Sequence, residues 1–174
     1  IQADFYINHI DDRIVCLPLK GTYTWSMLNY GHTFCRGLNS TISGQYNTGD
    51  WTFSLLTSFT WQDDRNRTNP GGKDYNDFVA YAPRWSFSAI YTFLWKGWSA
   101  SVSDMFVDKR YWTAQNSVDD PLDAYNCTDV KVGYTYRWLT VEAECQNLFD
   151  KPYEMIQRWP MPGRRYAVTM KFTL

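Results

Sequence analysis

The stretch WTFSLLTSFTW, residues 51–61, alternates between large apolar and small polar side chains with a period of two. Its odd-numbered positions carry Trp51, Phe53, Leu55, Phe59 and Trp61, whereas its even-numbered positions carry serines and threonines with one leucine as the exception. A period of two is that of a β-strand, whose successive side chains point to opposite faces of the sheet. The stretch therefore predicts a strand with one apolar and one polar face.

The same alternation recurs along the chain and predicts eight strands and no helix. Asp104 falls on the apolar parity of its segment, which indicates a β-bulge or the end of the apolar band at that point. The sequence thus predicts an all-β fold. Strong copies lie at 84–96, 129–138, 139–146 and 165–174, and weaker copies lie at 2–15, 34–46 and 98–111.

Two features separate a membrane barrel from a soluble β-sandwich. Aromatic rings stand at both ends of the apolar faces, as Trp51 and Trp61 do, and such girdles lie at the two interfaces of a bilayer. The second feature is that long and short links alternate, as in outer-membrane barrels. The strands of about 11–14 residues are also long enough to cross a bilayer at a tilt of roughly 45°, and a sheet that spans lipid must close. The long links are 16–33, 63–83, 112–126 and 150–162, and the short ones are 47–50, 96–97 and 137–138.

Composition agrees with an antiparallel up-and-down transmembrane β-barrel. The chain has 174 residues, 20.5 kDa, and 17 basic against 18 acidic residues, which argues against a nucleic-acid partner. Aromatic residues make up 18% of a chain whose mean hydropathy is only −0.48, as expected where rings meet both lipid and water. No apolar run is long enough for a transmembrane helix. The chain begins at Ile1 without a leader pattern, so we expect any signal peptide to have been removed or left out.

The sequence shows no pattern typical of an enzyme, a resident metal or a cofactor. It holds no Ser-His-Asp or Cys-His set, phosphate-binding glycine loop or H-E-x-x-H motif. His9 with Asp11 and Asp12 suggests a solvated cluster more than a cation site. The aspartate pairs at 63–64 and 119–120 can bind calcium or a cationic ligand, but turn formation and solubility explain them equally well. Scattered free thiols are favoured over disulfides, of which two at most can form. The cysteines are Cys16, Cys35, Cys127 and Cys145.

The C-terminal part resembles the end of a TonB-dependent outer-membrane receptor. NLFDKPY at 147–153 is similar to the element after that family's penultimate strand, and WPMPGR at 159–164 to the element that starts the last strand. Upstream, FYI at 5–7 with IDDRI at 10–14, YAP at 81–83 and GW at 97–98 are similar to further family elements, in the family's order. The chain ends on Leu174, whereas these receptors usually finish on Phe or Trp.

The resemblance implies that the chain is the C-terminal portion of a barrel domain, about the last eight of roughly 22 strands. It also implies that an N-terminal plug domain and the earlier strands are absent from this chain. The signature residues are expected to be structural, with Asn147 and Asp150 bonding nearby backbone and Gly163 allowing a tight backbone entry into the last strand. They are Asn147, Leu148, Phe149, Asp150, Tyr153, Pro162, Gly163 and Arg164.

The function that the resemblance implies is uptake of a large scarce nutrient, such as a ferric siderophore, cobalamin, haem or a glycan. The implied location is the outer membrane of a Gram-negative bacterium, and the implied partners are outer-membrane lipid, the nutrient and, through the missing plug, the TonB system. Inward-facing charged residues such as Lys131, Glu142 and Glu144 would contact the plug. The candidate ligand-binding residues are the loop aromatics Tyr75, Tyr111, Trp112 and Trp159.

Two other classes of protein remain open from the sequence alone. Eight strands can close around their own side chains, so the chain fits a complete eight-stranded barrel that acts as a membrane anchor or adhesin. A soluble, lipocalin-like binder is the third alternative, because its strands alternate in the same way.

Overall fold

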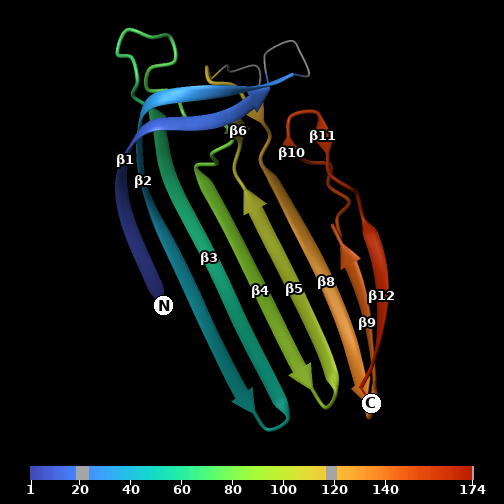
Figure 1. The fold of residues 1–174 in the computed structure, drawn as a ribbon. Coiled ribbons are helices and arrows are strands. Elements are labelled where there is room, and N and C mark those ends of the chain that lie inside the picture. The colour runs from blue at the N-terminus through green and yellow to red at the C-terminus, as the bar shows by residue number, and fades with distance from the viewer. Residues whose placement is uncertain (19–23, 117–120, 174) are drawn as a thin grey trace.

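The computed structural model describes residues 1–18, 24–116 and 121–173. Eight strands form one antiparallel sheet whose neighbours are hydrogen-bonded in chain order, with two small two-stranded sheets in the loops (Figure 1). The strands of the main sheet are β1 (Gln2–Pro18), β2 (Trp25–Thr48), β3 (Trp51–Asn66), β4 (Trp85–Trp95), β5 (Trp98–Val107), β8 (Tyr125–Tyr136), β9 (Leu139–Gln146) and β12 (Arg165–Phe172). The small sheets pair β6 (Arg110–Tyr111) with β7 (Pro121–Leu122) and β10 (Glu154–Ile156) with β11 (Trp159–Pro160).

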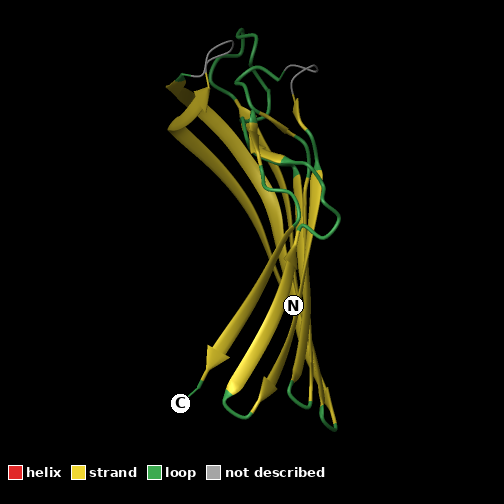
Figure 2. Cartoon of the chain, turned by 90° about the vertical axis from the view of Figure 1, so that its right-hand side faces the viewer, coloured by secondary structure: helices red, strands yellow, loops and turns green. Residues whose placement is uncertain are grey.

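The two ends of the sheet differ, as the spacing of the strands predicts. One end, called here the turn end, has the tight links 49–50, 96–97 and 137–138, and the other, the loop end, has all the long connections (Figure 2). At the link between β4 and β5, Lys96 and Gly97 both have positive φ, 43° and 87°, as a type I′ hairpin turn requires. A Cβ on Gly97 would lie 2.7 Å from the Thr135 carbonyl oxygen, so only glycine fits there.

Aromatic rings contact one another across strands at both ends of one face of the sheet. Near the turn end Trp51 stacks on Trp95 with centroids 4.7 Å apart, and Trp98 lies 4.7 Å from Tyr134. Towards the loop end Trp61 lies 6.2 Å from Trp85. We call the face that carries these rings the outer face, and the opposite one the inner face. The predicted girdles are therefore present, and each is built from cross-strand pairs.

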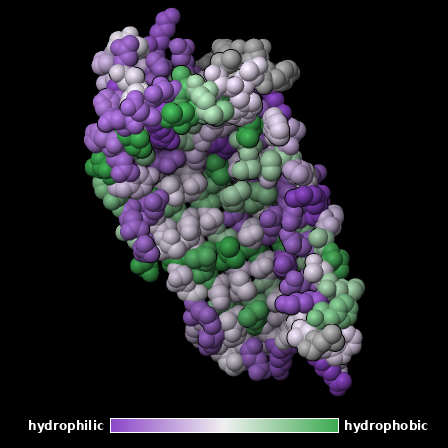
Figure 3. All heavy atoms as spheres, in the orientation of Figure 1, coloured by the Kyte–Doolittle hydropathy of each residue, from purple (hydrophilic) through white to green (hydrophobic). Residues whose placement is uncertain are grey.

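The inner face carries the polar parity of the strands. Lys131 on β8 lies 3.6 Å from the Glu142 carboxylate and 4.0 Å from that of Glu144, both on β9. The space-filling view from the side shown in Figure 1 has hydrophilic and weakly polar residues interspersed with a few hydrophobic ones (Figure 3). No helix in the described ranges is long and apolar enough to cross a membrane.

The first hairpin is longer than the alternation predicts. The sequence predicts a loop over 16–33, but β1 continues to Pro18 and β2 begins at Trp25. The alternation fails here because the buried positions of β2 change from odd-numbered to even-numbered residues. Thr33 and Cys35 are buried on one side of the change, and Tyr30 is buried on the other. The change occurs opposite Asp12, whose φ of 53° is in the left-handed region.

Other predicted details also need correction. Of the two predictions for Asp104, a β-bulge or the end of the apolar band, the bulge is wrong, because β5 stays in register with β4 and β8. The Asp104 carboxylate accepts a hydrogen bond of 2.6 Å from the Thr128 hydroxyl. The strand expected over 98–111 ends at Val107, and the residues that follow pair with β7 instead. The long links 112–126 and 150–162 contain short strands that have no alternation to reveal them.

The main sheet does not close on itself. β1 and β12 are its two edge strands, and they lie at opposite sides of the sheet (Figure 1). A complete eight-stranded barrel would need β1 hydrogen-bonded to β12, so the structure does not support that alternative. The open sheet instead has the form of a segment of a larger barrel wall.

Candidate ligand-binding region at the loop end

The loop end holds most of the buried side chains of the described residues. Tyr30, Val79 and Thr33 are exposed by at most 2%, and Trp112 and Leu122 are also buried. Along the strands between the aromatic girdles, by contrast, large apolar side chains such as Phe53 are exposed. The connections therefore pack into a body with its own core, which can hold side chains in fixed positions for a ligand.

The end of β1 and the start of β2 bend across the loop end of the sheet (Figure 1). Arg13 on β1 donates to the Asp64 carboxylate on β3 at 2.6 Å, and Asp64 is buried. Tyr30 on β2, which pairs with Arg13, is fully buried, and burial raises the pKa of its hydroxyl to about 12. The hairpin is thus fixed to the third strand by a charge-assisted hydrogen bond and a buried ring.

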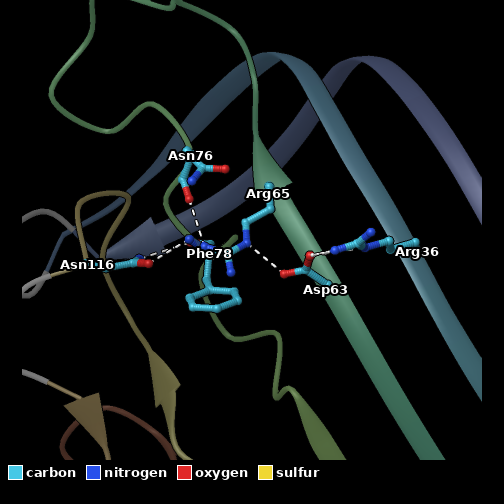
Figure 4. Close-up of polar contacts among 6 residues, drawn as sticks. All are labelled: Arg36, Asp63, Arg65, Asn76, Phe78 and Asn116. Carbon is cyan, nitrogen blue, oxygen red and sulfur yellow. Dashed lines mark hydrogen bonds and ion pairs between the residues drawn. The ribbon is translucent and has the colours of Figure 1, made fainter.

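The long link between β3 and β4 is held against the end of β3. The Val79 amide donates to the Asp64 carbonyl at 3.0 Å, and Phe78 forms a β-bridge with Arg65. The side chain of Asn116 accepts from the Phe78 amide at 2.6 Å and donates to its carbonyl at 3.0 Å (Figure 4). Two connections that are distant in sequence are therefore joined by backbone-like hydrogen bonds.

A charged cluster lies on the outer face beyond the aromatic girdle. Arg36 donates to Asp63 Oδ2 at 3.1 Å through Nη2, and Arg65 donates to Oδ1 at 2.6 Å (Figure 4). The Arg65 guanidinium also lies 3.6 Å from the centre of the Phe78 ring. Burial alone would raise the pKa of the Asp63 carboxyl, but the hydrogen bonds and charges of Arg65 and Arg36 outweigh it and lower that pKa.

An apolar pocket of about 450 Å³ lies between the first hairpin and the last long link. Trp25, the first residue of β2, meets the β10–β11 hairpin there, although more than a hundred residues separate the two segments. Each of the six lining residues except Ile156 carries an aromatic ring or a thioether. They are Trp25, Tyr81, Met155, Ile156, Trp159 and Met161.

The four predicted ligand-binding aromatics have separate environments. Tyr75 lies beside Arg67, whose guanidinium is 5.4 Å from its ring centre, and Tyr111 stacks on Phe78 with centroids 6.2 Å apart. Trp112 is 6% exposed and belongs to the core of the loops. Trp159, which is 66% exposed, lines the pocket.

The residues that sequence reasoning missed at the pocket are Trp25 and the aliphatic or thioether side chains Met155, Ile156 and Met161. Trp25 falls within 16–33, where the alternation predicts only a loop. The one sequence feature that could have indicated the pocket is the concentration of four large apolar residues within 155–161, in a predicted loop.

The signature residues form a hydrogen-bonded junction between β9 and β12. Asn147 is buried, donates to the Lys151 carbonyl at 2.9 Å and accepts from the Lys151 amide at 3.0 Å. Asp150 accepts from the Arg164 amide at 2.7 Å, and a Cβ on Gly163 would lie 2.6 Å from the same Asp150 oxygen. Asn147 and Asp150 thus bond nearby backbone groups, and the Asp150 carboxylate leaves no room for a side chain at Gly163.

The remaining signature residues surround that junction. The Leu148 amide donates to the Thr128 carbonyl at 2.8 Å, and Tyr153 stacks on Tyr125 with centroids 4.5 Å apart. Burial, with the nearby Cys127 thiol, raises the pKa of Tyr153 to about 12. Phe149, Pro162 and Arg164 are exposed.

The polar clusters considered from the sequence do not gather into a metal site among the described residues. His9 packs on Phe34, Asp11 pairs with His32, and Asp12 accepts from Asn29 at 3.5 Å. Asp63 and Asp64 bind arginines from different sides of the sheet. The pair 119–120 lies outside the described residues. All four cysteines are free.

Long antiparallel strands with aromatic girdles, tight turns at one end and packed loops at the other define the wall of a transmembrane β-barrel. The family model for the TonB-dependent receptor-like β-barrel matches residues 1–148. The chain belongs to this family of outer-membrane transport receptors. The match ends within the signature element, so residues 149–174 are assigned by the fold and by their motifs.

Solved structures with a similar fold include two import or siderophore receptors and a copper transporter. The ferric-catecholate import receptor Fiu from E. coli K12 is 18% identical with a TM-score of 0.74, and covers 98% of this chain. The siderophore receptor PiuA from Acinetobacter baumannii is 16% identical with a TM-score of 0.76 and the same 98% coverage. The copper transporter OprC is 18% identical with a TM-score of 0.70, again over 98% of this chain. The chain spans about a quarter of the length of these proteins, 24%, 25% and 28% respectively.

Proposed function

We propose that this chain is the C-terminal portion of the barrel of a TonB-dependent receptor, which imports a large scarce nutrient across the outer membrane of a Gram-negative bacterium. The observation that carries the proposal is the open sheet of a family barrel, with an apolar outer face and a polar inner face. Its edge strands β1 and β12 need partners inside a bilayer, because unpaired backbone groups are costly in lipid. The earlier strands of the barrel supply those partners.

The division of roles follows from the two faces and the loop end. The outer face contacts lipid, and the inner face contacts the N-terminal plug through charged residues such as Lys131, Glu142 and Glu144. The packed loops bind the nutrient on the outside of the cell. The nutrient is an iron–siderophore complex, cobalamin, haem or a glycan, and TonB moves it inward by acting on the plug.

The receptor binds and transports without changing its ligand chemically. The family consists of transport receptors, and the loop end offers aromatic, thioether and charged side chains for binding. The structural neighbours include receptors named for ferric catecholates and siderophores, which supports an iron complex as the first ligand to test.

The test uses the full-length receptor in its own bacterium. The deletion strain is grown with each candidate nutrient in turn: an iron–siderophore complex or haem as the sole iron source, cobalamin as the sole vitamin source, or a glycan as the sole carbon source. Deletion of the gene should abolish growth on one of these nutrients, and the receptor expressed from a plasmid should restore it. A receptor whose plug domain is mutated so that it no longer contacts TonB should bind that nutrient but fail to restore growth. Normal growth of the deletion strain on every nutrient, with no high-affinity ligand for the purified receptor, would overturn the proposal.

A further inference from the structure

We propose that a pocket on the outer face of the barrel wall binds a phosphorylated sugar of the glycolipid in the outer leaflet of the membrane. The inference rests on the proposed function for one point, that the loop end faces the outside of the cell. The occupant is a lipid of the surrounding membrane and not the imported nutrient. The pocket is lined by His9, His32, Thr33, Phe34, Arg67 and Tyr75.

The pocket lies on the outer face of the wall. Where β2 pairs with β3, Leu38 lies opposite Trp61 of the aromatic girdle. Phe34 lies opposite Arg65, four positions further along each strand. Because every second residue of a strand points to the same face, Phe34 is on the side that meets lipid. His9 on β1 packs on Phe34 with ring centroids 5.0 Å apart. A ligand therefore reaches this pocket from the membrane and not from the lumen.

The pocket lies at the height of lipid headgroups and of the sugars above them. The headgroup region extends about 5–8 Å beyond the hydrocarbon on each side of a bilayer. A strand rises about 3.4 Å per residue, which places Arg36 about 7 Å and Arg67 about 20 Å along the strands from the girdle. The heights above the hydrocarbon are smaller, because the strands of a barrel are tilted. Arg36 is thus level with lipid phosphates, and Arg67 is level with the sugars of a glycolipid.

Arg67 supplies the pocket with a cation that has no carboxylate partner. Its guanidinium donates to the Tyr75 hydroxyl at 3.3 Å and lies 5.4 Å from the centre of that ring. Within the described ranges it forms no ion pair. Asp11, an acidic residue beside the pocket, instead contacts the His32 imidazole. A guanidinium in this state matches the geometry of a phosphate, which accepts two parallel hydrogen bonds from it.

The neighbouring charged cluster adds positive charge to the same face. Arg36 and Arg65 share the single carboxylate of Asp63 (Figure 4). With Arg67 included, three guanidinium groups stand against two carboxylates, those of Asp63 and Asp11. The Arg36 side chain is 48% exposed, so a ligand can reach it. Basic pockets at the membrane surface attract the phosphate groups of lipids.

The walls of the pocket favour a phosphorylated sugar over phosphate alone. The rings of His9, Phe34 and Tyr75 offer flat apolar surfaces against which one face of a sugar ring packs. The volume of about 380 Å³ accommodates a sugar ring with a phosphate group. A free phosphate ion would use the guanidinium and leave these rings without a contact.

The test uses the full-length receptor in detergent, stripped of its own lipid, with rough lipopolysaccharide that has a phosphorylated core as the probe. Native mass spectrometry counts the lipid molecules bound to each receptor and gives their affinity. We expect this probe to bind about tenfold more tightly than the same lipid without its phosphates, because hydrogen bonds to the charged groups are lost. Phosphatidylglycerol, which has a phosphate but no sugar, should also bind more weakly, and inorganic phosphate should not displace the probe.

Arg67→Gln should weaken binding of the phosphorylated lipopolysaccharide about tenfold, and Arg67→Lys should weaken it less, because lysine keeps the charge. The matched control is Arg137→Gln. Arg137 also lies beside a tyrosine, 5.3 Å from the Tyr136 ring centre, but at the turn end of the sheet. Both arginines are exposed, so neither substitution should impair folding. The control should leave binding of the lipopolysaccharide unchanged.

The inference is overturned by equal binding of the phosphorylated and dephosphorylated lipids, or by equal effects of Arg67→Gln and Arg137→Gln. Displacement of the probe by an equal concentration of inorganic phosphate would identify a soluble anion as the occupant and would also overturn it. TonB-dependent uptake by a receptor that binds no lipopolysaccharide would leave the proposed function standing. Binding of lipopolysaccharide at Arg67 by a receptor that imports no nutrient would overturn the function and support the pocket.

Discussion

At the scale of single residues, Asp63 is the carboxylate that joins two neighbouring strands and a loop. It accepts hydrogen bonds from Arg36 on β2 and Arg65 on β3, and Arg65 in turn donates to the Asn76 carbonyl at 2.9 Å. One acidic side chain therefore organises two cations beyond the girdle. Because Asp63 itself is buried, this cluster differs from an exposed surface ion pair, which contributes little.

The pH dependence of stability should report on Asp63. Its pKa in the folded protein is lowered from the ordinary value of 3.8, so its contribution is fully present above pH 3.8 and is lost as the pH falls through the lower folded value. We expect Asp63→Asn to lower the thermal unfolding temperature of the full-length receptor at pH 7, and the difference from the native receptor to shrink at pH 3.

The matched control for that prediction is Asp50→Asn. Asp50 pairs with Lys96 at 3.2 Å at the turn end, but both side chains are 61% exposed. This substitution should change the unfolding temperature little at either pH. An equal effect of the two substitutions at pH 7 would mean that the Asp63 cluster contributes no more than a surface pair.

At the scale of elements, β2 fits closely against its neighbours at its middle and loosely nearer its turn end. A Cβ on Gly37 would lie 2.4 Å from the Tyr6 hydroxyl oxygen and 2.6 Å from the Trp61 carbonyl oxygen. A Cβ on Gly44, seven residues further along the same strand, would have no neighbouring atom within 4 Å. The contacts at Gly37 include backbone, which cannot move without shifting β3.

We therefore expect Gly37→Ala to impair assembly and Gly44→Ala to be tolerated. The measurement is the fraction of full-length receptor that migrates as a folded, heat-modifiable band after extraction from outer membranes. Gly37→Ala should lower the folded fraction or the temperature at which the band shifts. Equal behaviour of the two variants would show that β1 and β3 can separate at Gly37 without cost.

The elements that sequence analysis located are those in which a membrane face imposes a period of two. In the structure Trp61 lies opposite Trp85 and Trp51 opposite Trp95. This agrees with the apolar faces that the alternation predicts, although a period of two does not by itself set the register. The extension of β1 and β2 was missed, because lipid no longer sorts the side chains beyond the girdle and the parity changes near Asp12. The short strands in the loops have too few residues to show any period.

The candidate site was harder to predict for a related physical reason. Trp159 was recognised as a loop aromatic, but its neighbour Trp25 comes from the opposite side of the sheet, and only the folded hairpin brings the two together. Trp112 looked equivalent to Trp159 in sequence, yet it is buried in the loop core. Sequence distinguishes aromatic from aliphatic residues in a loop, but it carries no signal for which of them pack inward.

At the scale of the whole molecule, the apolar outer face suits contact with lipid and the polar inner face suits contact with water and the plug. Val102 and Ser103 are neighbours on β5 and point to opposite faces, with Val102 opposite Tyr91 and Val130, and Ser103 opposite Ile90 and Asp129. Val102 lies midway between the two aromatic girdles. If the outer face meets hydrocarbon, a charge at Val102 has no water to solvate it, whereas a cation at Ser103 faces the Asp129 carboxylate.

Val102→Arg should accordingly destabilise the full-length receptor by about 2–4 kcal/mol, the cost of arginine near the middle of a bilayer on the lipid face of a barrel. Ser103→Arg, the matched control on the adjacent residue, should cost much less. The free energy of unfolding is measured by denaturant titration of the receptor reconstituted in lipid vesicles. A larger loss for Ser103→Arg than for Val102→Arg would reverse the assignment of the faces, and the lipid-facing surface would then be the one that carries Lys131 and its two glutamates.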